Sequence, residues 1–229
     1  MIDLAWKYHD SAFVMDLAPE LPHYFTKKGA WSGHRRFAYD LVRFIKPETI
    51  VELGTHYGTS FFSFCQAIRD AQLPTCCYAI DTWQGDKHSG FYGEDVYQSV
   101  NAVNNREFPD IGRLLRIEFD KGLPKFENDS IDLLHIDGYH TYEAVRHDYL
   151  SWYPKLRENS VVLFHDTAVR RGDFGVYRLW GELSELPHFE FPHSNGLGVL
   201  FPKGVPDPFQ VVIKNKENII QHYLNKQSE

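Results

Sequence analysis

The chain has 229 residues, a length that suits one large α/β domain with a sizeable core. The formal net charge is -7 and no basic stripe occurs, which argues against a protein that binds nucleic-acid phosphates. The sequence shows neither a signal-peptide pattern nor an apolar run of the roughly 20 residues that cross a bilayer, so we expect a cytoplasmic protein. The three cysteines, Cys65, Cys76 and Cys77, lack the spacing of a zinc site and fit a reducing compartment.

Apolar runs alternate with helical patterns through most of the chain. Strands are predicted, in chain order, at Thr49–Gly54, Cys76–Asp81, Arg113–Asp120, Ile131–Asp137 and Ser160–Asp166. Their near-continuous apolar character is typical of strands that are covered on both faces, as in a parallel sheet. Apolar residues at helical spacing before, between and after these runs complete the pattern of a doubly wound α/β fold.

The two ends of the chain depart from this alternation. Residues 1–31 form an aromatic-rich segment, which we expect to pack across a homodimer or to cover the site. Ser194, Asn195 and Gly196 separate two strand-like pieces, and Asn-Gly between apolar runs predicts a hairpin, so the sheet should end in an antiparallel pair. The tail, residues 207–229, is interpreted as a terminal helix or as the start of a linker.

A glycine-containing loop directly follows the first predicted strand. Gly54 and Gly58 in ELGTHYGTS allow a tight turn and the close approach of a ligand, although an ordinary strand-to-helix turn has the same pattern. Glu52 and Asp81 stand near the ends of the first two strands. An acid at the end of the second strand suits both hydroxyls of a ribose, and Trp83 is expected to lie against an adenine. The loop therefore predicts nucleoside binding.

The stretch HIDGYH, at residues 135–140, places two histidines and an aspartate at the end of an apolar strand. Asp137 ends that strand, His140 lies in the loop beyond it, and the next strand ends in His165 and Asp166. If the two strands are neighbours, these four side chains converge at one edge of the sheet. Such a set suits a divalent cation such as Mg²⁺ or Mn²⁺, and a histidine among them suits proton removal from a hydroxyl.

Simpler interpretations of the same residues stay open. We expect His135 to be a core histidine. Asp137 is either a ligand or the cap of the following helix, and His140 is either a base or a surface loop residue. His165 is either a ligand or a residue that only orients Asp166.

Two loops are expected to border the site. Residues 82–97 mix glycines, aromatic residues and charges, which predicts a mobile loop that enters a helix near Glu94, and residues 169–175 form the second loop. Candidates to contact an acceptor are His88, Phe91 and Tyr92 in the first loop and Arg170, Arg171 and Asp173 in the second. His147 and Asp148, by contrast, are expected to be solvated helix residues.

Four stretches together resemble a known family. They are VELGTHYGTS, AIDTWQGDKHSGFYGEDVY, SIDLLHIDGYHTYEAVRHDYLSWYPKL and SVVLFHDT. In this order they resemble the class I S-adenosylmethionine-dependent methyltransferases, in particular the group often associated with glycosyltransferases. The resemblance covers about residues 32–202, so we delimit a methyltransferase domain at 32–206. It implies a Rossmann-like, seven-stranded, mostly parallel sheet that binds S-adenosylmethionine at its carboxyl edge.

The resemblance also implies roles for single residues. Those expected to bind the cofactor are Glu52, Gly54, Thr55, Gly58, Ser60, Asp81, Thr82, Trp83, Asp120 and Asp137. The pattern is also similar to metal-dependent sugar O-methyltransferases, which carry an Asp-x-x-His after the fourth strand and an acidic pair after the fifth. This implies Asp137 and Asp166 as ligands of a divalent cation and His140 as the general base. His165 replaces the first acid of the pair, and we predict it as a further ligand and a second catalytic residue.

The sequence thus predicts an S-adenosylmethionine-dependent O-methyltransferase that acts on a hydroxyl of a sugar or glycan. One alternative is an iron-dependent, hydroxylase-like relative on the same fold, since two histidines and a carboxylate are common iron ligands. Another is a non-catalytic nucleoside-binding module that scaffolds a glycosyltransferase. A glycosyltransferase partner or fusion and a homodimer are the expected associations, without nucleic acid or a membrane span.

Overall fold

The computed structural model describes residues 6–9 and 29–226. The strands are β1 (Thr49–Leu53), β2 (Cys76–Asp81), β3 (Gly85–Asp86), β4 (Gly90–Phe91), β5 (Gly112–Arg116), β6 (Ile131–Ile136), β7 (Leu156–His165), β8 (His188–Phe191) and β9 (Leu197–Leu200). The α-helices are α2 (Arg35–Ile45), α3 (Thr59–Ala71), α4 (Glu94–Glu107), α5 (Phe119–Gly122), α6 (Tyr142–Trp152), α7 (Val176–Leu183), α8 (Asp207–Lys214) and α9 (Lys216–Asn225). Three short 3-10 helices are η1 (Ala30–His34), η2 (Leu123–Lys125) and η3 (Tyr153–Lys155).

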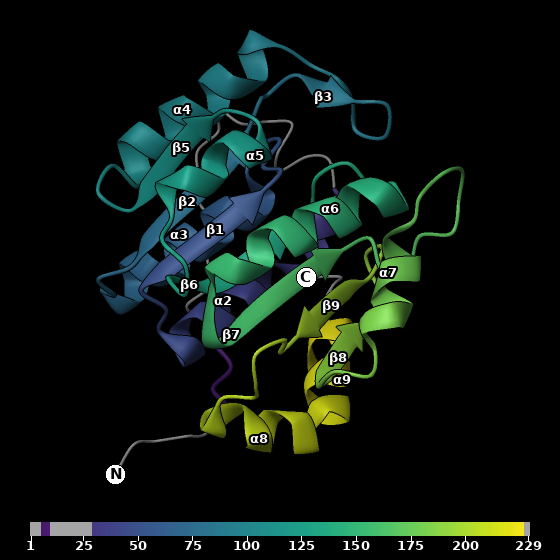
Figure 1. The fold of residues 1–229 in the computed structure, drawn as a ribbon. Coiled ribbons are helices and arrows are strands. Elements are labelled where there is room, and N and C mark those ends of the chain that lie inside the picture. Colours follow the sequence, from purple (N-terminus) through teal and green to yellow (C-terminus); the bar gives the residue numbers. More distant parts are fainter. Residues whose placement is uncertain (1–5, 10–28, 227–229) are drawn as a thin grey trace.

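The main sheet has seven strands in the order β5-β2-β1-β6-β7-β9-β8 (Figure 1). The five strands from β5 to β7 are parallel, and β9 runs antiparallel to both β7 and β8. This confirms the predicted doubly wound fold with an antiparallel end. The five predicted strands are all present, with β7 starting earlier than expected, at Leu156, and β5 ending earlier, at Arg116.

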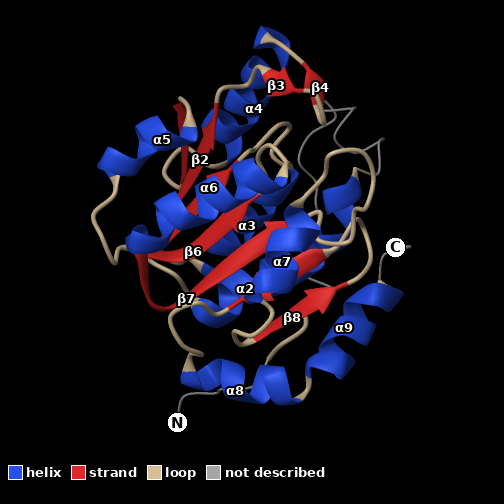
Figure 2. Cartoon of the chain, turned by 45° about the vertical axis from the view of Figure 1, so that its right-hand side comes forward, coloured by secondary structure: helices blue, strands red, loops and turns tan. Residues whose placement is uncertain are grey.

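Helices cover both faces of the sheet (Figure 2). Buried side chains of α2, α3, α4, α8 and α9 form one hydrophobic core, and those of α6 and α7 form the other. The strand β6 shows why its sequence is apolar on both sides. Leu133 belongs to the first core, whereas Leu134 and Ile136 belong to the second. Because successive side chains alternate, His135 faces the first core, where it is fully buried as predicted.

The tail forms two helices, α8 and α9, rather than a single one. Both pack on the domain, because Phe209 and Tyr223 are buried in the first core. The Tyr223 hydroxyl donates to Asp40 of α2 at 2.5 Å, and the Trp6 indole donates to Tyr223 at 3.0 Å. Phe13 and Tyr24 of the N-terminal segment lie outside the described residues, so the expected dimer contact or cover stays a prediction.

The loop after β2 contains a small hairpin, β3–β4, before it enters α4 at Glu94. The predicted loop-to-helix transition is therefore confirmed. The hairpin stands above the carboxyl ends of the parallel strands (Figure 1). Within the described residues, no helix has the length and apolar character needed to cross a membrane.

The prediction that His147 and Asp148 are both solvated is wrong for Asp148. His147 is exposed and pairs with Asp120 at 2.9 Å, but Asp148 is 7% exposed on the side of α6 that faces the sheet. Burial raises the pKa of Asp148 to about 7. The apolar spacing correctly predicts that Tyr149 and Trp152 are buried. It does not show that Asp148, which precedes Tyr149, lies on the same buried face of the helix.

Asp148→Asn is expected to stabilise the fold at neutral and alkaline pH. A carboxyl group whose pKa is raised in the folded state destabilises the fold as it ionises. The free energy of unfolding therefore falls as pH rises above the unfolded-state pKa of Asp148, and the fall is complete above its folded-state pKa of about 7. The gain in the free energy of unfolding should therefore grow by about 2–3 kcal/mol between about pH 5 and about pH 8. Urea denaturation at both pH values measures it. The exposed control Glu158→Gln should follow the wild-type profile, and a gain independent of pH would contradict the assignment.

Candidate active site

The ends of the two central strands meet at Gly54 and Asp137. The Asp137 amide donates to the Leu53 carbonyl at 2.9 Å, which carries the β1–β6 pairing to the sheet edge. Gly54 has φ +87°, and a Cβ atom there would lie 2.1 Å from the Asp137 carbonyl oxygen. Only glycine fits this backbone conformation and this close approach. The packing turns the loop after β1 toward α3 and holds Asp137 beside it.

Asp81 at the end of β2 holds the other side of this loop. One carboxylate oxygen accepts from the Thr55 amide at 2.8 Å and the His56 amide at 2.9 Å, and the other accepts from the Trp83 amide at 2.7 Å. Each carboxylate oxygen has more than one lone pair, so these bonds leave room for a ligand hydroxyl. The predicted acid therefore shapes the glycine loop and also faces a cavity.

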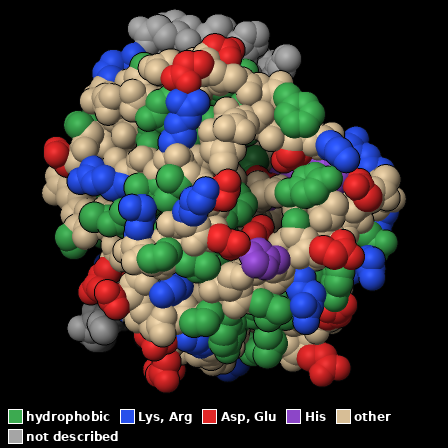
Figure 3. All heavy atoms as spheres, turned by 45° about the horizontal axis from the view of Figure 1, so that its top comes forward, with side chains coloured by type: hydrophobic (Ala, Val, Ile, Leu, Met, Phe, Trp, Pro, Cys, Tyr) green, Lys and Arg blue, Asp and Glu red, His purple; other side chains and the backbone are tan. Residues whose placement is uncertain are grey.

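A cavity of about 830 Å³ opens at the carboxyl edge, above the ends of β1, β2, β6 and β7. Acidic side chains border a hollow on this face of the molecule (Figure 3). The predicted site residues that line the cavity are Gly54, Thr55, Ser60, Asp81, Thr82, Asp137, His140, His165 and Asp166. The fold thus brings most of the predicted site together.

Four residues predicted to bind the cofactor do not line this cavity. Glu52 is fully buried, and its carboxylate accepts from His135 Nδ1 at 3.0 Å. His135 Nε2 in turn accepts from the Trp31 indole at 3.0 Å, so the Glu52 side chain is turned into a core network. Trp83 is also fully buried and donates to the His56 carbonyl at 2.9 Å, beneath the loop rather than against an adenine.

Asp120 is the third of these residues. It lies on the short helix α5 and pairs with the exposed His147. Because β5 ends at Arg116, the residues that reach the cavity come earlier, and Glu118 and Phe119 line it instead. Gly58 is the fourth, and it sits at the N-cap of α3 with φ +79°, where it turns the chain into the helix.

Sequence reasoning also missed residues that line the cavity. His56 stands in the loop between Gly54 and Gly58, and its ring centroid lies 4.5 Å from that of Tyr92. Burial lowers the pKa of His56, which favours a neutral imidazole. Trp31, in η1, closes another part of the wall. Trp31 is the last residue of the aromatic-rich N-terminal segment that was expected to pack across a homodimer or to cover the site.

Asp137, His140 and Asp166 form a compact group at the ends of β6 and β7. His140 Nε2 lies 3.3 Å from Asp137 Oδ1 and 2.9 Å from Asp166 Oδ2. One ligand atom from each residue lies within 4.8 Å of the others. His140 therefore completes the group that was predicted with His165.

The charges in this group stabilise one another. Burial opposes protonation of His140, but hydrogen bonds to the two carboxylates raise the pKa of its imidazole to about 10. Burial alone would raise the pKa of Asp137, but His165 and His140 hold it well below its ordinary value. A general base has to start as a neutral imidazole, so the base role of His140 stays a prediction.

His165 lies beside this group with both ring nitrogens engaged. Its Nε2 donates to the Ser194 carbonyl at 3.1 Å, so the proton on that nitrogen is fixed. Its Nδ1 lies 3.2 Å from Asp137 Oδ1 and 3.7 Å from Asp166 Oδ2. A second proton or a cation is needed to join Nδ1 to these carboxylates. His165 is thus a neighbour of the acidic pair, and its predicted roles as ligand and catalytic residue stay predictions.

Asp166 provides a direct test of whether a cation fits here. It has φ +62°, a conformation that is uncommon for a residue with a side chain. Its Oδ1 is buried and has no hydrogen-bond partner among the described residues. An unpaired buried carboxylate oxygen is costly, and a bound cation would compensate it. The oxygen and nitrogen donors of this group suit a divalent cation.

Loops close the side of the cavity beyond His140. His88, Phe91 and Tyr92 line the cavity, as expected for the first loop, and Arg171 lines it from the second. Asp173 lies outside the wall but pairs with His88.

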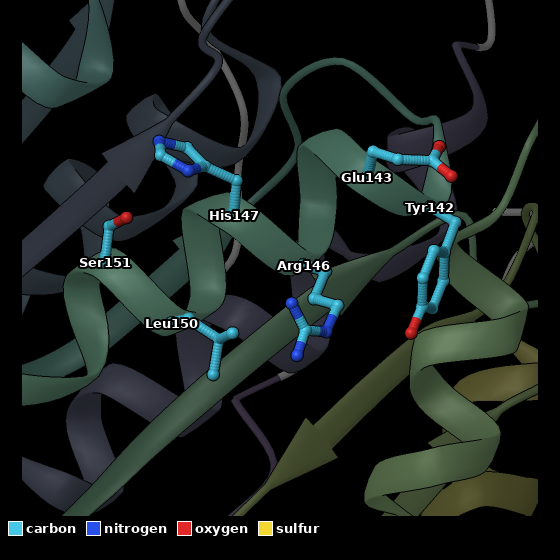
Figure 4. A pocket seen from close by; sticks show the side chains of 6 residues that line it. All are labelled: Tyr142, Glu143, Arg146, His147, Leu150 and Ser151. Carbon is cyan, nitrogen blue, oxygen red and sulfur yellow. The ribbon is translucent and has the colours of Figure 1, made fainter.

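Arg170 also lies outside the wall. Its guanidinium packs on the Tyr177 ring instead. A second, smaller depression of about 380 Å³ is lined by residues of α6, among them Tyr142, His147 and Leu150 (Figure 4).

Comparison with known proteins agrees with this arrangement. Residues 51–167, about half of the chain, match the family described as "Methyltransferase domain". The chain belongs to this methyltransferase domain family. The match begins in β1 and ends just after Asp166, so it contains Gly54, Asp81, Asp137 and Asp166.

A curated relative from Sinorhizobium fredii, described as uncharacterized protein y4gI, is 50% identical over 181 residues. These residues make up 79% of this chain and 20% of that protein. The chain therefore spans about a fifth of the length of this relative.

Solved methyltransferase structures share the fold at low identity. PaMTH1 from Podospora anserina, bound to S-adenosylhomocysteine, is 14% identical with a TM-score of 0.59 over 82% of this chain and 88% of its own. The O-methyltransferase TomG from Streptomyces achromogenes, in complex with S-adenosylmethionine, is 14% identical with a TM-score of 0.58 over 89% of this chain and 100% of its own. An O-methyltransferase from Bacillus cereus is 12% identical with a TM-score of 0.57 over 83% of this chain and 94% of its own.

Gly54→Ala is expected to destabilise the fold by about 2–4 kcal/mol, because it adds backbone strain and a clash with the Asp137 carbonyl. Gly90→Ala is the matched control. Gly90 has a similar φ of +84° with nothing within 4 Å of an added Cβ, so it should cost only about 1 kcal/mol. Urea denaturation compares the two. Equal losses would show that the close approach to Asp137 does not matter.

Proposed function

We propose that this chain is an S-adenosylmethionine-dependent O-methyltransferase domain. The observation that carries the proposal is the pair of carboxylates on the two sides of the glycine loop, Asp81 and Asp137. Both line one cavity at the carboxyl edge of a methyltransferase-family domain. In open α/β sheets, ligands bind at this edge. The S-adenosylmethionine and S-adenosylhomocysteine complexes of the structural neighbours support the same donor.

The strand order orients the donor. Asp81 at the end of β2 would accept hydrogen bonds from the ribose hydroxyls, and Phe119 after β5 would contact the adenine. The methionine part would then extend over the loop after β1 toward Asp137, because β1 lies between β2 and β6. Thr55 supports this orientation, since its buried hydroxyl lines the cavity and has no partner among the described residues.

The charge of the wall suits a cationic methyl donor. The acidic residues that line the cavity are Asp81, Asp86, Glu118, Asp137 and Asp166, whereas Arg171 is the only Lys or Arg among the described lining residues. A sulfonium is attracted to such a wall, and its charge is lost when the methyl group leaves. This arrangement favours methyl transfer over an iron-dependent hydroxylase.

We further propose that Asp137, His140 and Asp166 hold a divalent cation, with His165 beside them. When bound, such a cation would act as a Lewis acid that lowers the pKa of an acceptor hydroxyl. The two aspartates supply the negative charge and the Ser194 carbonyl fixes the proton position on His165. As a ligand His140 would be a neutral imidazole, because a protonated ring has no lone pair for a cation, whereas without the cation its protonated ring would balance the charge of the two carboxylates.

A sugar or glycan hydroxyl is our proposed acceptor. The resemblance to sugar O-methyltransferases suggests it, and the rings of Phe91, Tyr139 and Phe174 line the acceptor side of the cavity. Such rings offer apolar surface to the C–H face of a sugar. A glycosyltransferase, as a partner or as a fused domain, is the association that this acceptor implies.

The donor site is tested by calorimetric titration with S-adenosylhomocysteine. The wild type should bind in the micromolar range, and Asp81→Ala should weaken binding about tenfold or more by removing the ribose contact. The control Asp120→Ala, outside the cavity, should retain wild-type affinity. Absence of binding by the wild type, or undiminished binding by Asp81→Ala, would overturn the proposal.

The cation site is tested by Mn²⁺ binding measured with electron paramagnetic resonance. Asp137→Asn and Asp166→Asn should each weaken Mn²⁺ binding about tenfold or more, because each removes a charged ligand. Glu118→Gln, which also lines the cavity but lies outside the group, is the control and should bind as the wild type does. Mn²⁺ affinity that is unchanged in both aspartate variants would remove the cation from this place.

A further inference from the structure

The β3–β4 hairpin contacts the cofactor side of the cavity through Tyr92. The Tyr92 ring packs on that of His56, in the glycine loop, with 4.5 Å between ring centroids and 30° between planes. Gly85, with φ +72°, makes room for this ring, because a Cβ atom there would lie 2.7 Å from it. The backbone of the hairpin thus seats Tyr92 against the loop that would carry the methionine part of the donor.

The same hairpin contacts the acceptor side through His88. Its Nε2 lies 2.6 Å from Asp173 Oδ1 in the loop after β7, and only 7% of the His88 side chain is exposed. The His88 ring stacks on Phe174 with centroids 4.2 Å apart, and it lies 4.7 Å from the ring of Tyr139 after β6. His88 is therefore the point where loops from three strands meet.

Phe174 carries these contacts onward to His140. Their rings are nearly parallel, 9° apart in plane with centroids 5.0 Å apart. The backbones are also joined, because the Gly175 amide donates to the His140 carbonyl at 2.8 Å and Phe174 bridges to Thr141. Ring contacts thus join His56 to Tyr92 at one end and His88 through Phe174 to His140 at the other, and the backbone of the β3–β4 hairpin connects His88 to Tyr92.

We propose that His88 is a positioning residue that assembles the acceptor side of the cavity when the cofactor binds. This inference rests on the proposed donor site. Cofactor in the cavity would contact His56 and Tyr92 and fix the hairpin, and the His88–Asp173 pair would then hold the loop 169–175 on His140. The acceptor thereby meets an ordered His140 and Phe174 only after the donor is in place. Lids and loops commonly complete sites in this way.

Hydrogen exchange measured by mass spectrometry, with S-adenosylhomocysteine as the probe, tests this coupling. Saturating S-adenosylhomocysteine should slow exchange in peptides spanning 169–176 by at least about fivefold in the wild type. The Gly175 amide is the direct reporter, because it bonds to the His140 carbonyl. His88→Phe keeps a ring on Phe174 but removes the bond to Asp173, and Asp173→Asn removes the charge. Both should abolish the slowing while S-adenosylhomocysteine affinity stays within about twofold.

His147→Phe is the matched control, because His147 pairs with Asp120 in a similar way outside the cavity. It should retain the full slowing. Unchanged slowing in His88→Phe and Asp173→Asn, or none in a wild type that binds S-adenosylhomocysteine, would overturn the inference and leave the donor site standing. A wild type that does not bind S-adenosylhomocysteine would overturn both.

Discussion

The close packing of Gly54 against the Asp137 carbonyl is the constraint on which the site depends. It joins the ends of β1 and β6 at the centre of the sheet, where a side chain at residue 54 would have no room. The chain is thereby forced to turn between Asp81 on one side and Asp137 on the other. One neighbouring strand, β7, then brings Asp166 to His140. This contact therefore helps to place Asp81 on one side of the cavity and Asp137 with Asp166 on the other.

Much of the fold could be predicted because its strands are buried on both faces, which leaves a strong apolar signal in the sequence. The convergence of Asp137 and Asp166 also followed, since both end neighbouring parallel strands. Position at a strand end does not determine where a side chain points, however. Glu52 was expected in the cavity, but it lies before the end of β1 and turns into the core toward His135.

The remaining differences have local causes. Asp120 was expected at the adenine, but β5 is shorter than its sequence run, so Phe119 reaches the cavity instead. The His88–Asp173 pair joins residues far apart in the sequence, and no spacing rule predicts it. The sequence also did not predict that the carboxylates of Asp137 and Asp166 would both lie within 3.3 Å of the same nitrogen of His140. The apolar pattern of the sequence predicts which residues lie at the same edge of the sheet. It does not predict the distances between their charged atoms, on which their protonation depends.

A crystal structure of the chain with S-adenosylhomocysteine and Mn²⁺ tests the central claim most directly. We expect the ribose hydroxyls to lie within hydrogen-bond distance of Asp81 and the adenine to lie beside Phe119. Mn²⁺ should be bound by Asp137, His140 and Asp166. A ligand bound outside this cavity, or a ribose held away from Asp81, would contradict it.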